Sequence, residues 1–176
     1  MGKILNLLRE GDNRTTGQVS EAVRLAIADT RHIDELVDLM SYSNPAVRMR
    51  AADALEKATV QRTDLLALHK DFLLDLIETA TQNELRWHVA QMLTRLDLEA
   101  DEIDDLALIF TKWFERADSR IVRTAALQGM ADLAHKDPSL IDTALKMTQS
   151  ALASPIPALK ARARKLKGPL ERLKSD

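Results

Sequence analysis

The chain has 176 residues, of which 45% are apolar, 30% charged and 3% aromatic, and its net charge is -2. This composition excludes a disordered chain, and the near-neutral charge excludes a general attraction to nucleic acid or to an anionic membrane surface. The absence of cysteine excludes disulfides, thiolate metal sites and a cysteine nucleophile. The apolar stretch before Arg9 is too short for a signal peptide or a membrane span, so we expect a cytoplasmic protein without membrane contacts.

Few aromatic residues and many Leu and Ala residues favour helices over strands. In chain order, apolar spacing predicts helices over residues 3–9, 18–29, 32–41 and 45–59, with a turn at 11–17. A further helix pair begins near Thr63 and turns at 81–83, and another pairs residues 102–116 with 119–135. The final pair begins at Asp137-Pro138, and we expect Gly168-Pro169 to break or kink its last helix.

A short phrase recurs at the start of the second helix of each pair. Its clearest copy is Asn44-Pro45-Ala46-Val47-Arg48, in which Asn44 is a good N-cap and Pro45 suits the first helical position. The cations of the four copies are Arg48, Arg86, Arg123 and Lys160, at spacings of 38, 37 and 37 residues. This regular period indicates a repeat architecture.

Amphipathic helix pairs bury their apolar stripes by stacking on one another. The cation-aligned copies place Leu55, Leu93 and Met130 at one core position, whereas the last copy has Arg164 and Lys167 at core positions, as a solvent-facing terminal repeat requires. We therefore predict one all-α domain over 1–176, a right-handed α-solenoid of about four to five stacked antiparallel helix pairs. Its expected parts are an irregular entering segment at 1–30 and repeats at about 31–60, 63–97, 101–136 and 137–173.

A two-helix repeat of about 37 residues whose second helix opens with Asn-Pro-x-Val-Arg resembles the HEAT-repeat proteins. The resemblance covers roughly residues 18–172. In that family the arginine ties adjacent repeats through hydrogen bonds along the stack. The resemblance therefore implies a structural role for Arg48, Arg86 and Arg123, with Lys160 a lesser version.

No catalytic constellation is recognisable, and we expect neither a cofactor nor a metal site. His32, His69, His88 and His135 are scattered over different helices, and a zinc site without cysteine would need several of them to converge with carboxylates. The acidic stretch from Asp97 to Asp105 has two interpretations. It is either a docking site for cations or, as we expect, a helix start at which carboxylates favour the positive end of the dipole.

The candidate binding surface is a concave groove lined by the second helices. Its members occupy positions predicted to be exposed: Arg50, Trp87, His88, Gln91, Arg95, Gln128 and Arg162. Trp87 is either the anchor for a partner or a core residue folded between helices, whereas Trp113 belongs to the core beside Phe110 and Phe114. A basic patch of Lys160, Arg164, Lys165 and Lys167 is either a polar cap or a phosphate-binding site.

These features favour a non-enzymatic scaffold that binds a segment of another protein in the groove, with Trp87 as anchor. The alternative is a nucleic-acid-binding or DNA-repair protein, because helical repeats with a basic concave face and tryptophan also resemble the alkylpurine DNA glycosylases. A third hypothesis is a subunit of a complex whose partner is encoded nearby.

Overall fold

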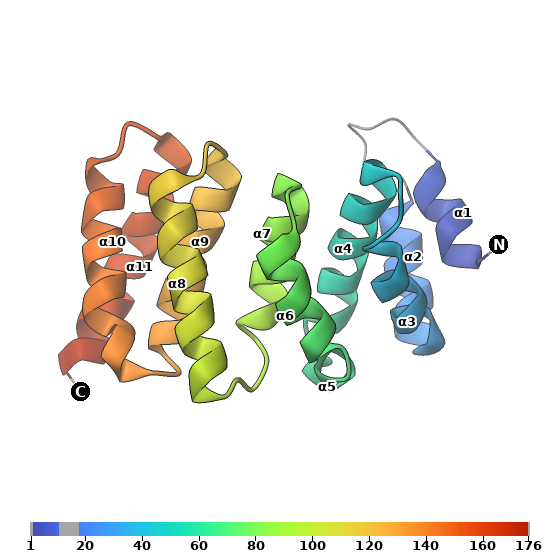
Figure 1. The fold of residues 1–176 in the computed structure, drawn as a ribbon, viewed down its shortest axis with the longest axis horizontal. Coiled ribbons are helices and arrows are strands. Elements are labelled where there is room, and N and C mark those ends of the chain that lie inside the picture. The colour runs from blue at the N-terminus through green and yellow to red at the C-terminus, as the bar shows by residue number, and fades with distance from the viewer. Residues whose placement is uncertain (1, 11–17, 176) are drawn as a thin grey trace. The chain divides into compact units, whose positions relative to one another are not determined.

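The computed structural model describes residues 2–10 and 18–175, and the turn predicted at 11–17 lies outside these residues. The described residues form eleven α-helices and one short 3-10 helix, and they contain no strand (Figure 1). The predicted all-α class is therefore confirmed. Each described helix is too short or too polar to cross a bilayer.

The chain divides into two compact units, one ending at Leu96 and the other beginning at Asp97. The first unit contains α1 (Lys3–Arg9), α2 (Val19–Ala28), α3 (Arg31–Leu39), α4 (Pro45–Thr59), α5 (Thr63–Ala67), α6 (Lys70–Thr79) and α7 (Asn83–Leu93). Helix α4 is its centre, because α1, α2, α3 and α7 all pack against it. Fully buried aliphatic side chains such as Leu8, Leu36, Leu55, Leu73 and Met92 fill the space between these helices.

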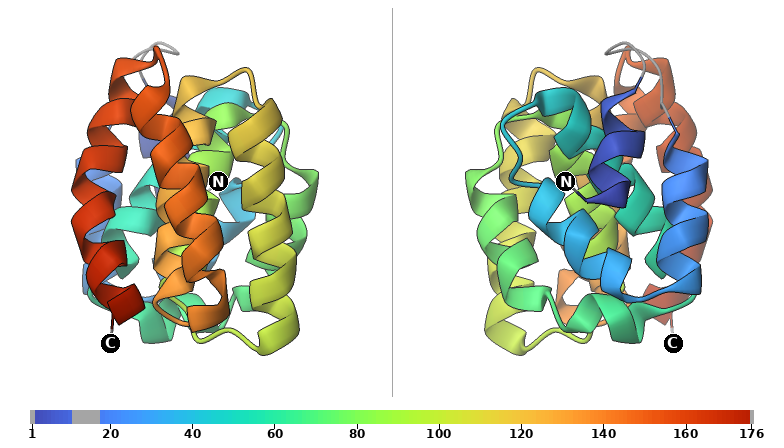
Figure 2. Two further views of the ribbon diagram at one scale, coloured as in Figure 1. Left: turned by 90° about the vertical axis from the view of Figure 1, so that its left-hand side faces the viewer. Right: turned by 90° about the vertical axis from the view of Figure 1, so that its right-hand side faces the viewer.

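The second unit contains α8 (Ala100–Arg116), α9 (Arg120–Ala134), the 3-10 helix η1 (Pro138–Leu140), α10 (Ile141–Ala153) and α11 (Pro157–Ser175). Helix α8 packs against α9, and α10 runs antiparallel beside α11 (Figure 2). Phe110, Trp113 and Phe114 are buried, so the core position predicted for Trp113 is confirmed.

The break predicted at Gly168-Pro169 is absent, because α11 continues through Pro169 to Ser175. A proline inside a helix removes one hydrogen bond and crowds the carbonyl four residues earlier. Here Lys165, whose carbonyl is affected, is exposed, so water can satisfy that group. Gly168 has no Cβ to clash with the proline ring, which removes the usual penalty at the preceding residue.

The recurring phrase opens α4, α7, α9 and α11. The predicted Asn44 cap is present, since Asn44 Oδ1 accepts from the Ala46 amide at 2.9 Å, and Ser119 Oγ accepts in the same way from the Val122 amide at 3.4 Å. The aligned core positions Leu55, Leu93 and Met130 are all fully buried. The charged residues at the matching positions of the last copy, Arg164 and Lys167, are exposed, as predicted for a terminal repeat.

The arginines of the phrase bind main-chain carbonyls in the last turn of the preceding helix or in the residues that follow it. Arg48 donates to the carbonyls of Tyr42 and Ser43 at 2.8 and 3.1 Å. Arg86 donates to Ala80 at 2.6 Å and Arg123 to Phe114 at 2.8 Å. These bonds lie within a helix pair, whereas the family resemblance implied bonds between pairs. The antiparallel arrangement explains the difference, since the start of the second helix lies beside the unsatisfied carbonyls that end the first.

One link of the expected kind joins successive pairs of the first unit. Arg48 Nε donates to the Gln82 side chain at 3.2 Å, and Gln82 Nε2 donates to the Pro45 carbonyl at 2.9 Å. Gln82 stands in the turn before α7, so it ties that turn to the start of α4.

Close packing of α8 on α9 depends on the absence of a side chain at Gly129. A Cβ atom built on Gly129 would lie 2.5 Å from the Phe110 ring. Alanine has the higher helix propensity, by about 1 kcal/mol, but overpacking a core costs about 1–3 kcal/mol.

We expect Gly129→Ala to lower the midpoint of urea unfolding monitored by circular dichroism. The same substitution in a Phe110→Leu background should cost less, and equal costs in both backgrounds would contradict the steric explanation.

Candidate functional site

Trp87 is an exposed aromatic ring held on a rigid support. It lies on α7, and 37% of its surface is exposed. Its ring stacks on the neighbouring His88 ring, with 4.5 Å between the ring centres and 25° between the planes. Trp87 is therefore not a core residue: its ring lies against His88, and part of its surface remains open to solvent.

Two other residues predicted to line the groove are buried, so their predicted exposure is wrong. Arg50 is 1% exposed and donates to the Leu8 carbonyl at 2.7 Å, in the last turn of α1. His88 is 5% exposed. The alignment of the repeats predicts both residues on an outer face because it considers each helix without the helices that pack on it. In the structure α1 covers one part of α4, and α4 covers the His88 side of α7.

Beneath Trp87, two carboxylates of α4 approach His88. Asp53 and Glu56 are three residues apart and therefore share a helix face, with side chains 14% and 15% exposed. One ligand atom from each of Asp53, Glu56 and His88 lies within 4.8 Å of the other two. The sequence search missed this group because it looked for several histidines, whereas the structure joins one histidine to carboxylates 35 and 32 residues earlier in the chain.

Two cations balance these carboxylates. Lys57 Nζ lies 2.9 Å from Asp53, and its side chain is about half exposed. The Arg95 guanidinium forms an ion pair with the Glu56 carboxylate and also donates to the Glu56 carbonyl at 3.3 Å. Arg95, predicted as a groove residue, thus lies beside α4 and links it to the end of α7. Gln91, another predicted member, is half-buried, and its carbonyl accepts from Arg95 Nε at 3.0 Å.

The environment of His88 favours its neutral form. Burial is the main cause that lowers the pKa of His88 below its ordinary value of 6.5, and the nearby Lys57 adds to the effect. The negative charges of Asp53 and Glu84 oppose this shift. The Nδ1 atom of His88 is buried and has no hydrogen-bond partner. A neutral imidazole with an unused nitrogen is a chemically available ligand.

The remaining predicted groove residues, Gln128 and Arg162, lie in the second unit. Arg162 donates to Gln128 Oε1 at 2.7 Å, and Gln128 Nε2 donates to Asp132 Oδ1 at 2.7 Å. These bonds join α9 to α11. Within each unit, polar residues of the predicted groove thus bond to a neighbouring helix.

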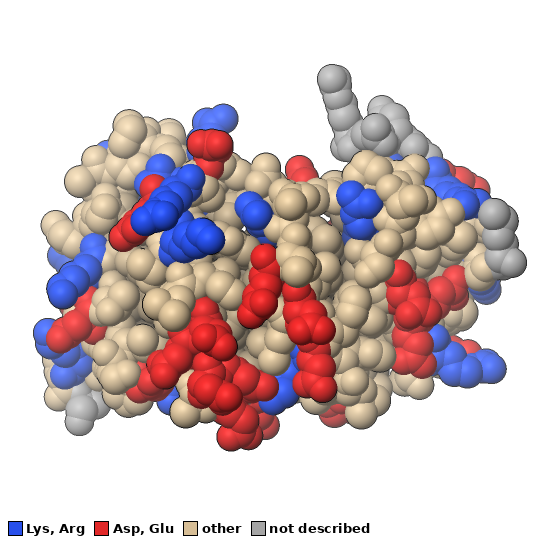
Figure 3. Space-filling view, in the orientation of Figure 1, with Lys and Arg blue, Asp and Glu red and all other residues tan. Residues whose placement is uncertain are grey.

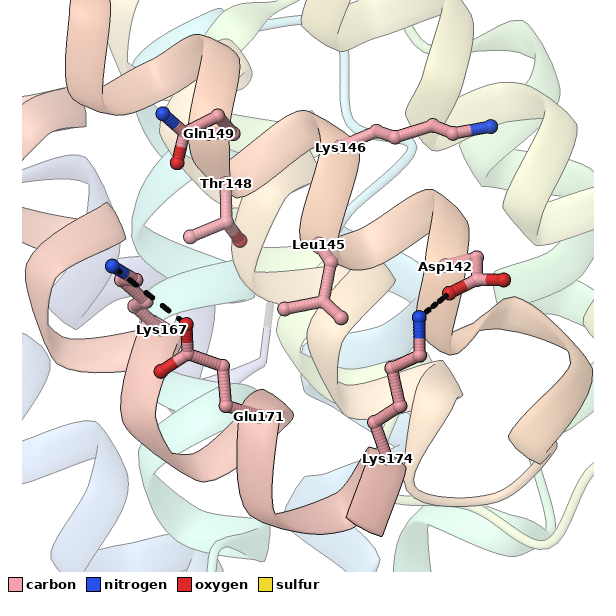
Figure 4. Close-up of a pocket in the computed structure, with 8 residues that line it drawn as sticks. All are labelled: Asp142, Leu145, Lys146, Thr148, Gln149, Lys167, Glu171 and Lys174. Atoms are coloured by element: carbon pink, nitrogen blue, oxygen red, sulfur yellow. Dashed lines mark hydrogen bonds and ion pairs between the residues drawn. The ribbon is translucent and has the colours of Figure 1, made fainter.

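The predicted basic patch belongs to α11, where Arg164, Lys165 and Lys167 are exposed and Lys160 is half-buried. Beside it, α10 and α11 enclose an open pocket of about 400 Å³ (Figure 4). Two of the three lysines that line this pocket face carboxylates: Lys174 Nζ lies 2.7 Å from Asp142, and Lys167 Nζ lies 3.7 Å from Glu171. The ion pair with Lys174 also lowers the pKa of Asp142. These carboxylates weaken the attraction of the pocket for phosphate.

The acidic stretch marks a helix start. Glu99 caps α8 reciprocally with Glu102, whose carboxylate accepts from the Glu99 amide at 2.7 Å. Asp101, Asp104 and Asp105 are exposed on the first turns, where Figure 3 shows acidic side chains gathered at the beginning of α8. The helix-start interpretation is therefore confirmed.

Comparison with protein-family models, with curated proteins and with solved structures found no match. The resemblance to HEAT repeats therefore rests on the recurring phrase and on the repeat period.

Arg50 should contribute to folding rather than to binding. We expect Arg50→Ala to lower the free energy of unfolding by about 2–4 kcal/mol, because it opens a cavity and leaves the Leu8 carbonyl without this donor. Urea unfolding monitored by circular dichroism measures the change. Arg24→Ala, which removes an exposed arginine of α2, is the control and should leave the unfolding curve nearly unchanged. Equal curves for the two variants would contradict a structural role for Arg50.

The lowered pKa of His88 predicts how stability changes with pH. Above pH 6.5 the imidazole is neutral in both states; as the pH falls below 6.5, the unfolded chain binds a proton that the folded chain resists. The contribution of His88 to stability is thus present at neutral pH and is lost as the solution becomes acidic. We expect the free energy of unfolding, measured with urea, to fall less between pH 7 and pH 5 for His88→Gln than for the wild type. An unchanged slope in His88→Gln would contradict the shift.

Proposed function

We propose that the protein is a non-enzymatic protein-interaction module of the HEAT-like α-solenoid class. The repeat period, the antiparallel helix pairs within each unit and the cations that open α4, α7 and α9 support this class. In this proposal the first unit binds a segment of another protein on the face formed by α4 and α7. The observation that carries the proposal is Trp87, an exposed tryptophan stacked on a buried ring.

The surroundings of Trp87 suit a peptide with an apolar anchor. Tryptophan is enriched among the residues that contribute most to binding energy, and a side chain that is already held in place loses little entropy on binding. The charged groups nearby are paired, Asp53 with Lys57 and Glu56 with Arg95. Their charges balance, so the favoured partner carries an apolar or aromatic side chain for Trp87 and no strong net charge of its own.

Nucleic-acid binding is the weaker alternative. A strand that stacks on Trp87 would need cations that are free to meet its phosphates. Lys57 and Arg95 are instead held by carboxylates, which repel phosphate. We expect no mobility shift of duplex DNA at low or moderate salt, and a shift abolished by Trp87→Ala would favour the alternative.

The proposal is tested by comparing three forms of the full chain as affinity baits in extract of the source cells. We expect at least one protein to be retained by the wild type and by Leu68→Ala but lost from Trp87→Ala. Leu68 is the matched control, because it is an exposed apolar residue of the same unit. With the purified partner, Trp87→Ala should weaken affinity at least about tenfold, as for a central interface residue.

Fluorescence provides a direct measure of the same contact. The chain has two tryptophans, so a Trp113→Phe background leaves Trp87 as the only reporter. Partner binding should shift its emission to shorter wavelength as water leaves the ring. This face is not the docking site if the partner binds the Trp113→Phe protein without changing its emission and binds Trp87→Ala with unchanged affinity.

A further inference from the structure

We propose that Asp53, Glu56 and His88 form a binding site for a single divalent transition-metal ion, of which Zn²⁺ fits best. The site joins α4 to α7 within the first unit. It differs from the proposed partner-binding contact, because its ligand atoms belong to Asp53, Glu56 and His88 rather than to the exposed Trp87 ring.

The geometry of the three side chains carries this inference. Their ligand atoms lie within 4.8 Å of one another, although they come from two helices. Zinc bonds of about 2.0–2.2 Å in tetrahedral geometry place neighbouring ligand atoms about 3.4 Å apart. The group therefore needs to contract by about 1.4 Å or less, which rotations of the Asp53 and Glu56 side chains would have to supply.

The state of His88 is a second and independent observation. Only 5% of the residue is exposed, and its buried Nδ1 atom has no hydrogen-bond partner. A buried polar atom without a partner destabilises the fold, and a bound ligand can remove that cost by supplying the partner. A metal ion would use one ring nitrogen of a neutral imidazole, and the other nitrogen would then be a donor.

The ligand types select the metal. One imidazole nitrogen with two carboxylate oxygens suits Zn²⁺ and its first-row neighbours. Ca²⁺ requires six to eight oxygen ligands, and Mg²⁺ favours an octahedral shell of oxygens. Three protein ligands leave a fourth position for water, so the site as built resembles an open rather than a closed zinc site.

The cations of the network compete with the metal ion. Lys57 pairs with both carboxylate oxygens of Asp53 at 2.9 Å, so a metal ion bound at Asp53 must displace its half-exposed side chain into solvent. Arg95 binds one carboxylate oxygen of Glu56, Oε1, which leaves Oε2 as the second oxygen for the metal. Removal of Lys57 should therefore strengthen metal binding.

The test uses the full chain, stripped with a chelator and titrated with Zn²⁺ by isothermal calorimetry at pH 7.5. We expect one saturable site per chain and a higher melting temperature with Zn²⁺. His88→Gln, Asp53→Asn and Glu56→Gln should each weaken binding at least about tenfold. Lys57→Gln should strengthen it, and His69→Gln, a control in the same unit, should leave it unchanged. Ca²⁺ and Mg²⁺ should not displace the ion.

Cobalt provides a readout of geometry. Co²⁺ in place of Zn²⁺ should give visible absorption bands that Asp53→Asn weakens and Lys57→Gln preserves. Circular dichroism establishes that each variant is folded, and if His88→Gln fails to fold, the Asp53 and Lys57 variants decide the question. The proposal is overturned if Zn²⁺ shows no saturable binding, or if its affinity is the same in the wild type, Asp53→Asn and Lys57→Gln.

Discussion

The packing of α4 against α7 is the contact on which the rest of the first unit depends. Helix α4 carries the buried alanines Ala51 and Ala54 and α7 carries the buried Ala90, and small side chains at a contact let two helices approach closely. This approach brings the carboxylates of α4 to the imidazole of α7 and leaves Trp87 at the edge with one face covered. The polar network and the exposed ring are thus two consequences of one apolar contact, and a change that separates the helices would remove both.

Much of the fold could be predicted from the sequence, because its signals are local. The Asn44-Pro45 cap, the period of the cations and the apolar stripes specify helix starts and buried faces, and α4 spans the predicted residues 45–59. The failures have a common physical origin. Arg50 and His88 were assigned to solvent from helical spacing alone, but exposure depends on which other helix covers a face. The continuity of α11 through Pro169 likewise depends on solvent access to a single carbonyl.

The candidate site was predictable only in part. Trp87 stood out in the sequence because a tryptophan among polar positions is unusual, and the structure leaves it exposed. Asp53 and Glu56 gave no such signal, since acidic residues three apart are common on helix surfaces. Their importance arises from His88, which approaches them from the next helix pair. A contact between two helices is a tertiary property, and the residue spacing within one helix does not predict it.

The central claim is that His88 is a buried, neutral imidazole stacked under Trp87. Long-range proton–nitrogen NMR of the histidine side chains tests it most directly, with His88→Gln to assign the signals. The structure predicts that His88 titrates below the ordinary pKa of 6.5 and that its ring protons are shifted upfield by the Trp87 ring current, a shift lost in Trp87→Ala. A His88 that titrates at its ordinary value, without an upfield shift, would contradict both the burial and the stacking.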